Sequence, residues 1–326
     1  MKTEILKMLR ESTGYLSGQQ LCEKLSVSRT AIWKVIHQLE EEGYEIEAIR
    51  NKGYCLVGSP DILSKEELRS LSTTTWLGKE IVYMSETDST NKQAKRLADT
   101  GAVHGTVVVA DMQQAGKGRR GKTWISPGGT SIYLSMILRP ELEPPQAPML
   151  TLLMAYSVAR VLRDKEELNV KIKWPNDIVL HKKKICGILT EMSTEIDYIN
   201  HVVIGVGINV NGECVPEELQ NTATSIRIEE GRAIKRAELI TEILEHFEKN
   251  YEKFIACGSL AFIQKEYNAL LINCDREVKV LEPKHEYTAY ALGINETGEL
   301  LVKTATGDIE TIYAGEVSVR GIYGYV

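Results

Sequence analysis

The sequence lacks the features that mark secreted, membrane-spanning and zinc-stapled proteins. Its six cysteines are scattered and form no C-x-x-C pair, so their spacing predicts no structural zinc site. No apolar run reaches membrane-spanning length, and the N-terminus leads into an amphipathic segment instead of an apolar signal core. We therefore expect reduced thiols, a cytoplasmic location and no membrane contact.

Positive charge is also scarce. The formal net charge is -6 over 326 residues, so a general polyanion-binding surface is not expected and any nucleic-acid contact requires a local basic surface. Hydrophobic residues make up 43% and charged residues 26%, which is typical of globular proteins and argues against disorder. The length favours two or three domains.

Residues 1–63 carry the pattern of a small helical module that ends in a hairpin. Three helices and two paired strands are expected, at residues 3–10, 19–25, 29–42, 44–50 and 54–57. Ser28 is suited to cap the third helix, and Asn51-Lys52-Gly53 forms the hairpin turn. No acidic residue occurs from Leu25 to Leu39, so the start and middle of the third helix keep a basic face.

This arrangement resembles a winged helix-turn-helix, in which the third helix enters the major groove and the wing contacts the backbone. The candidate DNA contacts are Ser28, Arg29, Thr30, Trp33, Lys34, His37, Arg50 and Lys52. The module holds eight Lys or Arg against nine Asp or Glu, which leaves a protein-interaction module as the alternative. Such a balance predicts weak DNA binding by a monomer, because phosphate contacts supply much of the affinity.

After a linker at Ser59-Pro60-Asp61, strands and helices mix without a regular βαβ alternation, which favours an α+β fold. Strands are expected at residues 81–84, 106–111, 131–138, 170–174, 184–191 and 201–210, and helices at 91–99 and 149–162.

The loop at 116–123, with the sequence GKGRRGKT, matches two phosphate-binding patterns, G-x-G-x-x-G and G-x-x-x-x-G-K-T. Both patterns require a helix that begins at the end of the loop, whereas Pro127, Gly128 and Gly129 follow shortly. We therefore interpret both matches as accidental. Four cations and no acid suit the loop to a phosphate, and a solvated basic surface loop is the alternative.

Five segments in order carry a family resemblance: DSTN at 88–91, the basic loop within 113–124, KWPND at 173–177, KICGIL at 184–189 and GVGINVN at 205–211. Together they are similar to the biotin protein ligases. The resemblance is strongest over about residues 80–215 and extends over the whole chain. The family's loop often has Arg where this chain has Lys117. Lysine keeps the positive charge but lacks the guanidinium group, which can donate two parallel hydrogen bonds to one anion.

The resemblance implies ATP-dependent ligation of biotin to a lysine of a biotin carboxyl carrier protein, through biotinyl-5'-AMP and with Mg²⁺ accompanying ATP. It makes Lys184, Arg119 and Lys117 the candidate catalytic residues, with Lys184 bridging carboxylate and phosphate. The candidate residues for biotin and adenylate are Ser89, Thr90, Asn91, Gln113, Gly116, Lys117, Gly118, Arg119, Arg120, Trp124, Asn176, Lys184, Gly187 and Asn209.

Some site assignments keep a structural alternative. Residues 89–91 can equally form a helix N-cap, and Lys184 alone is typical of an exposed strand lysine. Asn176 and Asp177 have no individual roles assigned, and no set of protein metal ligands is predicted.

The last third of the sequence predicts helices, then strands. The helices are expected at residues 233–254 and 260–267, and the strands at 288–294, 299–304, 310–313 and 316–320. The resemblance implies a catalytic domain over residues 64–272 and a small SH3-like β-barrel over 273–326.

The resemblance also implies regulation. Biotinyl-5'-AMP would act as a corepressor by ordering the basic loop, favouring a homodimer and strengthening binding to operator DNA. A lipoate ligase, whose family shares the catalytic architecture, and a non-enzymatic ligand-sensing repressor are the rival interpretations.

Overall fold

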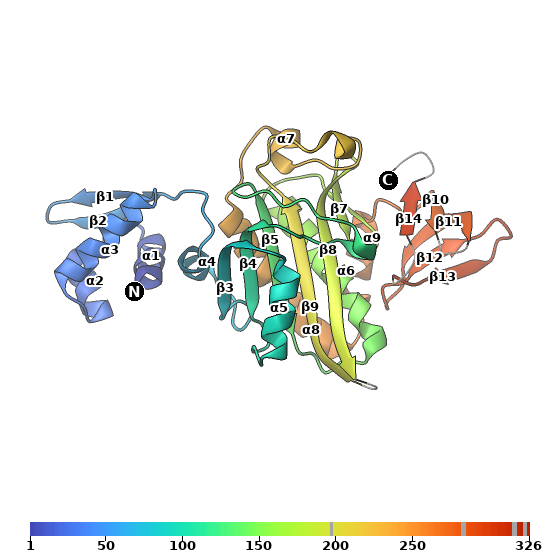
Figure 1. Cartoon of the computed structure of the whole chain (residues 1–326), viewed down its shortest axis with the longest axis horizontal. Helices are drawn as coiled ribbons and strands as arrows, with labels where there is room; N and C mark the ends of the chain where they lie inside the picture. Colours follow the sequence, from blue (N-terminus) through green and yellow to red (C-terminus); the bar gives the residue numbers. More distant parts are fainter. Residues whose placement is uncertain (196–197, 282–284, 315–317, 322–324) are drawn as a thin grey trace. The chain divides into compact units, whose positions relative to one another are not determined.

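The computed structural model describes residues 1–195, 198–281, 285–314, 318–321 and 325–326 (Figure 1). The chain divides into two compact units. The first unit contains Met1–Thr73 and Lys235–Thr241, and the second contains Thr74–Ile234 and Glu242–Val326. No described helix is long and apolar enough to cross a membrane.

The first unit contains the predicted three helices and hairpin. Its elements are α1 (Lys2–Glu11), α2 (Gly18–Leu25), α3 (Arg29–Glu41), β1 (Glu45–Ile49), β2 (Gly53–Gly58) and α4 (Lys65–Leu71). Ser28 caps α3 as predicted, because its side chain accepts a hydrogen bond from the Ala31 amide at 3.2 Å. The wing is an antiparallel pair, and its turn uses positive φ angles at Asn51 and Gly53.

Helix α4 was not predicted, and it packs against α1. Arg10 of α1 forms an ion pair with the buried Glu67 of α4 at 2.7 Å, and Glu67 also accepts a hydrogen bond from the Tyr44 hydroxyl. Burial and this hydrogen bond raise the pKa of Tyr44. Contacts therefore continue past residue 63, where the sequence suggested a boundary; the boundaries at 63 and 272 stay predictions.

The second unit is built on a seven-stranded sheet in the order β3-β4-β5-β9-β8-β7-β6. Its strands are β3 (Ile81–Thr87), β4 (Val107–Gln113), β5 (Ser131–Leu138), β6 (Lys171–Lys173), β7 (Asp177–Leu180), β8 (Lys183–Glu195) and β9 (Tyr198–Asn209). The pair β3 and β4 is parallel and the other described neighbours are antiparallel, which confirms the α+β prediction.

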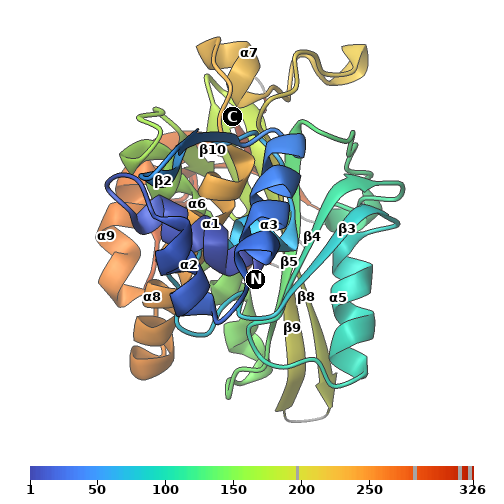
Figure 2. The same cartoon turned by 90° about the vertical axis from the view of Figure 1, so that its left-hand side faces the viewer.

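Helices cover both faces of this sheet (Figure 2). Helix α5 (Thr90–Asp99) packs on β4, β5 and β9, where Ala94 and Ala98 meet Val108, Ile137 and Val203. The apolar α6 (Ala147–Asp164) packs on the opposite face, against β6 to β9. Because strand side chains alternate between faces, β9, which contacts both helices, supplies one set of residues to α5 and the other to α6.

The remaining elements confirm the helix-then-strand prediction for the end of the chain. They are α7 (Ile226–Glu230), α8 (Arg236–Cys257), α9 (Ala261–Leu270), β10 (Arg276–Leu281), β11 (Glu286–Ile294), β12 (Leu300–Lys303), β13 (Ile309–Ile312) and β14 (Ser318–Gly321). The strands form an antiparallel sheet in the order β13-β12-β11-β10-β14. Closure into an SH3-like barrel stays a prediction, and residues 316 and 317 of the expected strand 316–320 lie outside the described residues.

Candidate functional site

Two cavities meet in the second unit. The larger cavity has a volume of about 320 Å³ and the smaller cavity about 50 Å³. Their common wall is formed by Gly118, Arg119, Trp124, Asn176 and Lys184. A side chain in this wall can contact two ligands at once, so the arrangement suits a reaction that joins them.

The smaller cavity is bordered by the first turn of α5. The Thr90 amide donates to Gln113 Oε1 at 2.9 Å, and Ser135 Oγ donates to Asn91 Oδ1 at 2.6 Å. Asn91 Nδ2 in turn donates to Glu191 Oε2 at 2.8 Å. Each polar group is thus held by another, which fixes their positions before a ligand arrives.

Ser89 borders the same cavity and is buried, but its side chain makes no capping hydrogen bond to α5 among the described residues. Ser89 therefore occupies the N-cap position of α5 that the alternative assigned to this segment, but without a side-chain capping hydrogen bond. The Thr90 amide, which a cap would have left to water, is bonded to Gln113 instead.

Three glycines form the floor of the smaller cavity, and we call Gly187, Gly205 and Gly207 the glycine floor. A Cβ atom on Gly205 would lie 2.0 Å from Asn91 Oδ1, and one on Gly207 would lie 2.7 Å from the Trp124 indole. A Cβ atom on Gly187 would lie 2.9 Å from Lys184 Cε. Only glycine permits this approach, because any larger residue overlaps the neighbouring side chains.

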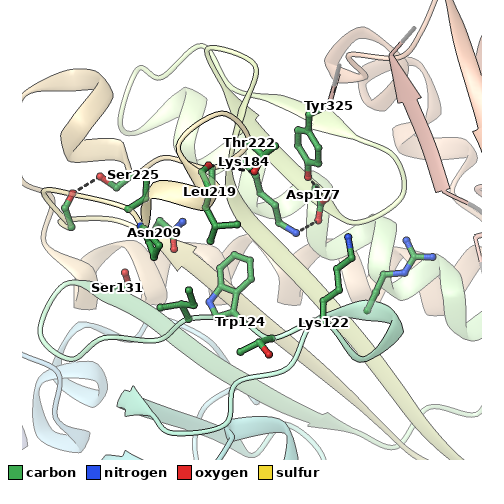
Figure 3. Close-up of a pocket in the computed structure, with 18 of the residues that line it drawn as sticks. Lys122, Trp124, Ser131, Asp177, Lys184, Asn209, Leu219, Thr222, Ser225 and Tyr325 are labelled. Atoms are coloured by element: carbon green, nitrogen blue, oxygen red, sulfur yellow. Dashed lines mark hydrogen bonds and ion pairs between the residues drawn. The ribbon is translucent and has the colours of Figure 1, made fainter. Parts of the chain in front are cut away.

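Lys184 lies at the start of β8 and points into the junction of the two cavities (Figure 3). Its Nζ is 2.6 Å from Asp177 Oδ1 and 5.2 Å from the centroid of the Trp124 ring. Its backbone amide donates to Thr222 O at 2.8 Å, which anchors the strand beside the loop. The lysine is therefore positioned by an ion pair and by the backbone, unlike a free surface side chain.

The larger cavity is bounded by the basic loop, the loop before α7 and the C-terminal residues. Asn209 at the end of β9 fixes the loop before α7 by donating to Thr224 O at 3.0 Å. Several cations face this cavity, namely Arg119, Arg120, Lys122, Lys173, Lys184 and Arg320. Burial lowers the pKa of Lys173 to about 8, an effect that Asp177 opposes. A ligand with several negative charges suits this lining.

The basic loop closes on itself without a following α-helix. Lys117 and Thr123 form an antiparallel bridge, and the Gly118 amide donates to Lys122 O at 2.7 Å. Only a short 3₁₀ turn (Arg119–Gly121) occurs before β5 in this described stretch. The prediction that neither phosphate-binding pattern is a true P-loop or dinucleotide fold is confirmed.

Arg119 is the loop cation that borders both cavities. Its guanidinium donates to Asn176 Oδ1 at 2.8 Å and to Ala314 O at 2.6 Å. Burial lowers its pKa, although Asp177 opposes the effect. Lys117 and Arg120 remain exposed.

The chain is similar to known proteins along nearly its whole length. A sequence profile of the Biotin/lipoate A/B protein ligase family matches residues 83–209, an HTH domain matches residues 2–55, and the Biotin protein ligase C terminal domain matches residues 274–320. The bifunctional ligase/repressor BirA of Bacillus spizizenii is 39% identical over 98% of both chains. The chain belongs to the family of bifunctional biotin ligase/repressors.

Other relatives agree with this assignment. The BirA protein of Escherichia coli is 32% identical over 93% of this chain and 92% of its own. The biotin protein ligase of Aquifex aeolicus, solved in complex with biotin and ATP, superposes with a TM-score of 0.66 at 32% identity. That match covers 74% of this chain and 99% of the other chain.

Most of the site residues predicted from the sequence border the two cavities. Ser89, Thr90, Asn91, Gln113, Lys117 and Gly187 border the smaller cavity, Arg120 and Asn209 border the larger one, and Gly118, Arg119, Trp124, Asn176 and Lys184 border both. Gly116 borders neither, but a Cβ atom there would lie 2.5 Å from Trp124 O, so it shapes the loop. Their roles in binding and catalysis stay predictions.

The sequence interpretation missed Lys173, Arg320 and Tyr325, which the fold brings to the larger cavity. Lys173 lies inside the KWPND segment, so that segment was a usable signal for it. Tyr325 is the second-last residue and has no local signal, because its contact with Asp177 spans 148 positions.

No protein-built magnesium site is present in the described part of the chain. It contains no cluster of three His, Cys, Asp or Glu side chains suited to a metal ion. Asp177 is the only acid among the described residues that border the larger cavity. The predicted Mg²⁺ therefore has no residue cage here and would depend on the phosphates of a bound nucleotide.

The predicted DNA contacts lie together on the first unit. All eight side chains, namely Ser28, Arg29, Thr30, Trp33, Lys34, His37, Arg50 and Lys52, belong to exposed residues of α3, its N-cap or the wing. Trp33 is 56% exposed and stacks on His37 with ring centroids 5.4 Å apart. An exposed tryptophan on a face with few acids favours a binding surface over a packing role.

Proposed function

We propose that the chain activates biotin with ATP and transfers it to a lysine of a biotin carboxyl carrier protein. The observation that carries the proposal is the position of Lys184 in the wall shared by the two cavities. The smaller cavity, lined by amides and hydroxyls, suits the ureido ring of biotin, and the larger, cationic one suits ATP.

In the first step, a biotin carboxylate oxygen attacks the α-phosphorus of ATP and pyrophosphate leaves. Negative charge accumulates at the junction of the cavities, where Lys184 and Arg119 supply positive charge, and Lys117 adds positive charge from the smaller cavity. Lys184 must exchange its ion pair with Asp177 for a phosphate oxygen, so Asp177 holds the lysine ready before substrates bind.

In the second step, the deprotonated amine of the acceptor lysine attacks the carbonyl carbon of biotinyl-5'-AMP and AMP leaves. The mixed anhydride is sensitive to water, so the basic loop must exclude solvent until the acceptor arrives. Arg119 supports this closure because it joins the loop to Asn176 and to the Ala314 carbonyl. ATP and carrier proteins are available in the cytoplasm, where we place the reaction.

An intact-mass assay tests the proposed activity. The chain is mixed with ATP, magnesium, biotin and a biotin carrier domain, and lipoate replaces biotin in a parallel reaction. We expect the carrier to gain the mass of one biotin only when ATP is present, and to gain nothing with lipoate. A gain with lipoate alone would make the chain a lipoate ligase, and no gain with either acid would leave it a ligand-sensing repressor.

We also propose that α3 and the wing bind operator DNA, with biotinyl-5'-AMP as corepressor. The matched HTH domain and the exposed basic face of α3 support this role. Because the module has no net positive charge, we propose that an adenylate-bound homodimer supplies the affinity.

Titration of genomic operator fragments tests the repressor role, with and without biotin plus ATP. Equal affinity in both states would exclude the corepressor mechanism, since a ligand shifts only an equilibrium whose two states it binds differently. Lys34→Ala should weaken binding to every fragment alike and lower the salt dependence by about one counterion. Lys24→Ala, on α2, is the matched surface control.

A further inference from the structure

The C-terminal end of the chain contributes a side chain to the larger cavity. Tyr325 borders this cavity, and its hydroxyl donates a hydrogen bond to Asp177 Oδ2 (Figure 3). Its ring lies over Lys173, whose Nζ is 3.4 Å from the ring centroid. Tyr325 does not border the smaller cavity. Tyr325 therefore contacts both Asp177 and the buried Lys173, and it does so only in the cavity that is proposed to bind the nucleotide.

The two oxygens of Asp177 are divided between two partners. Oδ1 is paired with Lys184 Nζ at 2.6 Å, and Oδ2 accepts from Tyr325. A carboxylate with one oxygen fixed in this way cannot rotate freely to follow the lysine. The tyrosine hydroxyl therefore determines where Asp177 holds Lys184 in relation to the two cavities.

Lys173 is the second group that Tyr325 controls. The lysine is only 5% exposed, and no carboxylate lies within ion-pair distance of it in the described part of the chain. The face of an aromatic ring attracts a cation, and the same ring keeps water away from it. Asp177 favours the charged form of Lys173, whereas Lys184, Arg320 and Lys122 oppose it.

We propose that Tyr325 is a positioning residue of the adenylation site. Its hydroxyl fixes Asp177, and through Asp177 the starting position of Lys184, while its ring holds Lys173 as a dry cation facing the nucleotide phosphates. The inference rests on the proposed function, because the first half-reaction is the step that Tyr325 serves. It makes Tyr325 part of the site.

Three full-length variants separate the two contacts. Tyr325→Phe keeps the ring and removes the hydroxyl, Tyr325→Ala removes both, and Tyr290→Phe is the control, because Tyr290 is 41% exposed and borders neither cavity. Biotinyl-adenylate formation is followed by pyrophosphate release at saturating biotin over a range of pH. Biotin affinity is measured by calorimetry without ATP, and unfolding in urea reports stability.

We expect Tyr325→Phe to lower kcat for adenylation roughly tenfold, the usual effect of losing a hydrogen bond to a charged group. Its biotin affinity should match that of the wild type, and so should the pH at which its adenylation rate falls on the alkaline side of the pH–rate profile. Tyr325→Ala should be slower still, and its alkaline limb should move to higher pH, because water reaches Lys173 and restores its charged form. Tyr290→Phe should behave as the wild type.

Two outcomes would overturn the inference. One is adenylation by Tyr325→Phe and Tyr325→Ala at the wild-type rate. The other is an equal loss of biotin affinity, rate and stability with no shift of the alkaline limb, which is the pattern of a purely structural residue.

If the wild type releases no pyrophosphate, the proposed function fails first. Stabilisation by ATP then becomes the test of Tyr325, and equal stabilisation of the wild type and Tyr325→Ala would overturn the inference by itself.

Discussion

The smaller cavity is walled largely by helix and strand residues, whereas the larger cavity takes more of its wall from loops and from the C-terminal residues. Around the smaller cavity, Thr90 and Asn91 come from a helix and the glycine floor comes from strands, while Glu191, outside the lining, holds Asn91 by a hydrogen bond. Around the larger cavity, the basic loop, the loop before α7 and the C-terminal residues join strand residues such as Lys173 and Lys184. The two halves of one site thus have different kinds of support.

This difference matches what each half is proposed to recognise. A small, largely uncharged ring system is selected by shape and by fixed donors and acceptors, which strands and helices hold accurately. A polyphosphate is held by charge, which tolerates movement and allows loops to open and close around it. Variants at the shared wall, at the glycine floor and in the loop should therefore affect the two substrates differently.

The largest effect is expected at the shared wall. Lys184→Met keeps the approximate length of the side chain and removes its charge, so adenylation should fall roughly 10²–10³-fold, as when an oxyanion donor is lost. Biotin affinity without ATP should change far less. Pyrophosphate release and calorimetry measure the two quantities. The control is Lys183→Met, because Lys183 directly precedes Lys184 in β8 and borders neither cavity. A Lys184→Met variant with wild-type adenylation would remove the lysine from the mechanism.

The glycine floor should give the next largest effect and should act mainly on biotin. In Gly205→Ala the new methyl group overlaps Asn91 Oδ1, which Ser135 holds in place, so stability should fall by about 1–3 kcal/mol. Biotin affinity should fall at least about tenfold, because the same overlap displaces the pocket's polar groups. Urea unfolding and calorimetry report the two losses. Gly128→Ala, whose nearest neighbour is 3.5 Å away, serves as the comparison. Unchanged biotin binding in Gly205→Ala would place the biotin site elsewhere.

A smaller effect is expected in the basic loop. Arg119→Lys keeps the charge but cannot donate to Asn176 and Ala314 together in the geometry of the guanidinium, so one of these hydrogen bonds is lost. Adenylation should slow about tenfold and free adenylate should leak into solution faster. Thin-layer separation of released adenylate measures the leak. Arg120→Lys, an exposed neighbour, should leak no faster than the wild type. Equal rates of adenylate release from the wild type and both variants would contradict the proposed role of the Arg119 guanidinium.

The smallest effect concerns pH. Burial opposes ionisation of Glu191, but hydrogen bonds from Lys95 and Asn91 outweigh it and hold its pKa below the usual range. A lowered folded-state pKa gives stability above the unfolded value near 4.3, and this stability is lost as pH falls through the folded pKa. Because the Lys95–Glu191 ion pair is partly exposed, the loss in free energy of unfolding should be below about 1 kcal/mol. The stability difference between wild type and Glu191→Gln, from urea unfolding, should shrink between neutral and acid pH. A constant difference would mean that the carboxylate charge does not matter.

Local patterns were enough to predict much of the fold. Three features depend on neighbouring residues and can therefore be predicted from the sequence: the start of α3 at Ser28, the hairpin turn at Asn51 and Gly53, and the long apolar run of α6. The same holds for the basic loop, where Pro127 and two glycines exclude a helix. Short elements such as α4 and β7 were missed, because their stability comes from distant partners such as Arg10 for α4.

The site was predictable where chemistry is concentrated in short segments and hidden where it depends on folding. Lys184 and its partner Asp177 stand in recognisable segments, but Tyr325, which bonds the other oxygen of Asp177, is reached only through tertiary structure. Ser89 takes the N-cap position of α5 without a side-chain capping hydrogen bond, and the Thr90 amide next to it is bonded by Gln113 from a strand, which local sequence does not reveal. Sequence patterns give residue types, whereas their partners depend on the fold.

The glycine floor has a consequence for redesigning the protein. Where a pocket is bounded by side chains, truncating one of them makes room for a bulkier ligand. Here the boundary on that side is backbone, and Gly187, Gly205 and Gly207 have nothing left to remove. A variant that accepts a larger acid must gain its space from the facing side, at Trp124 or along the first turn of α5. Mutational libraries directed at the floor will therefore narrow the range of accepted acids, and libraries directed at the opposite wall will widen it.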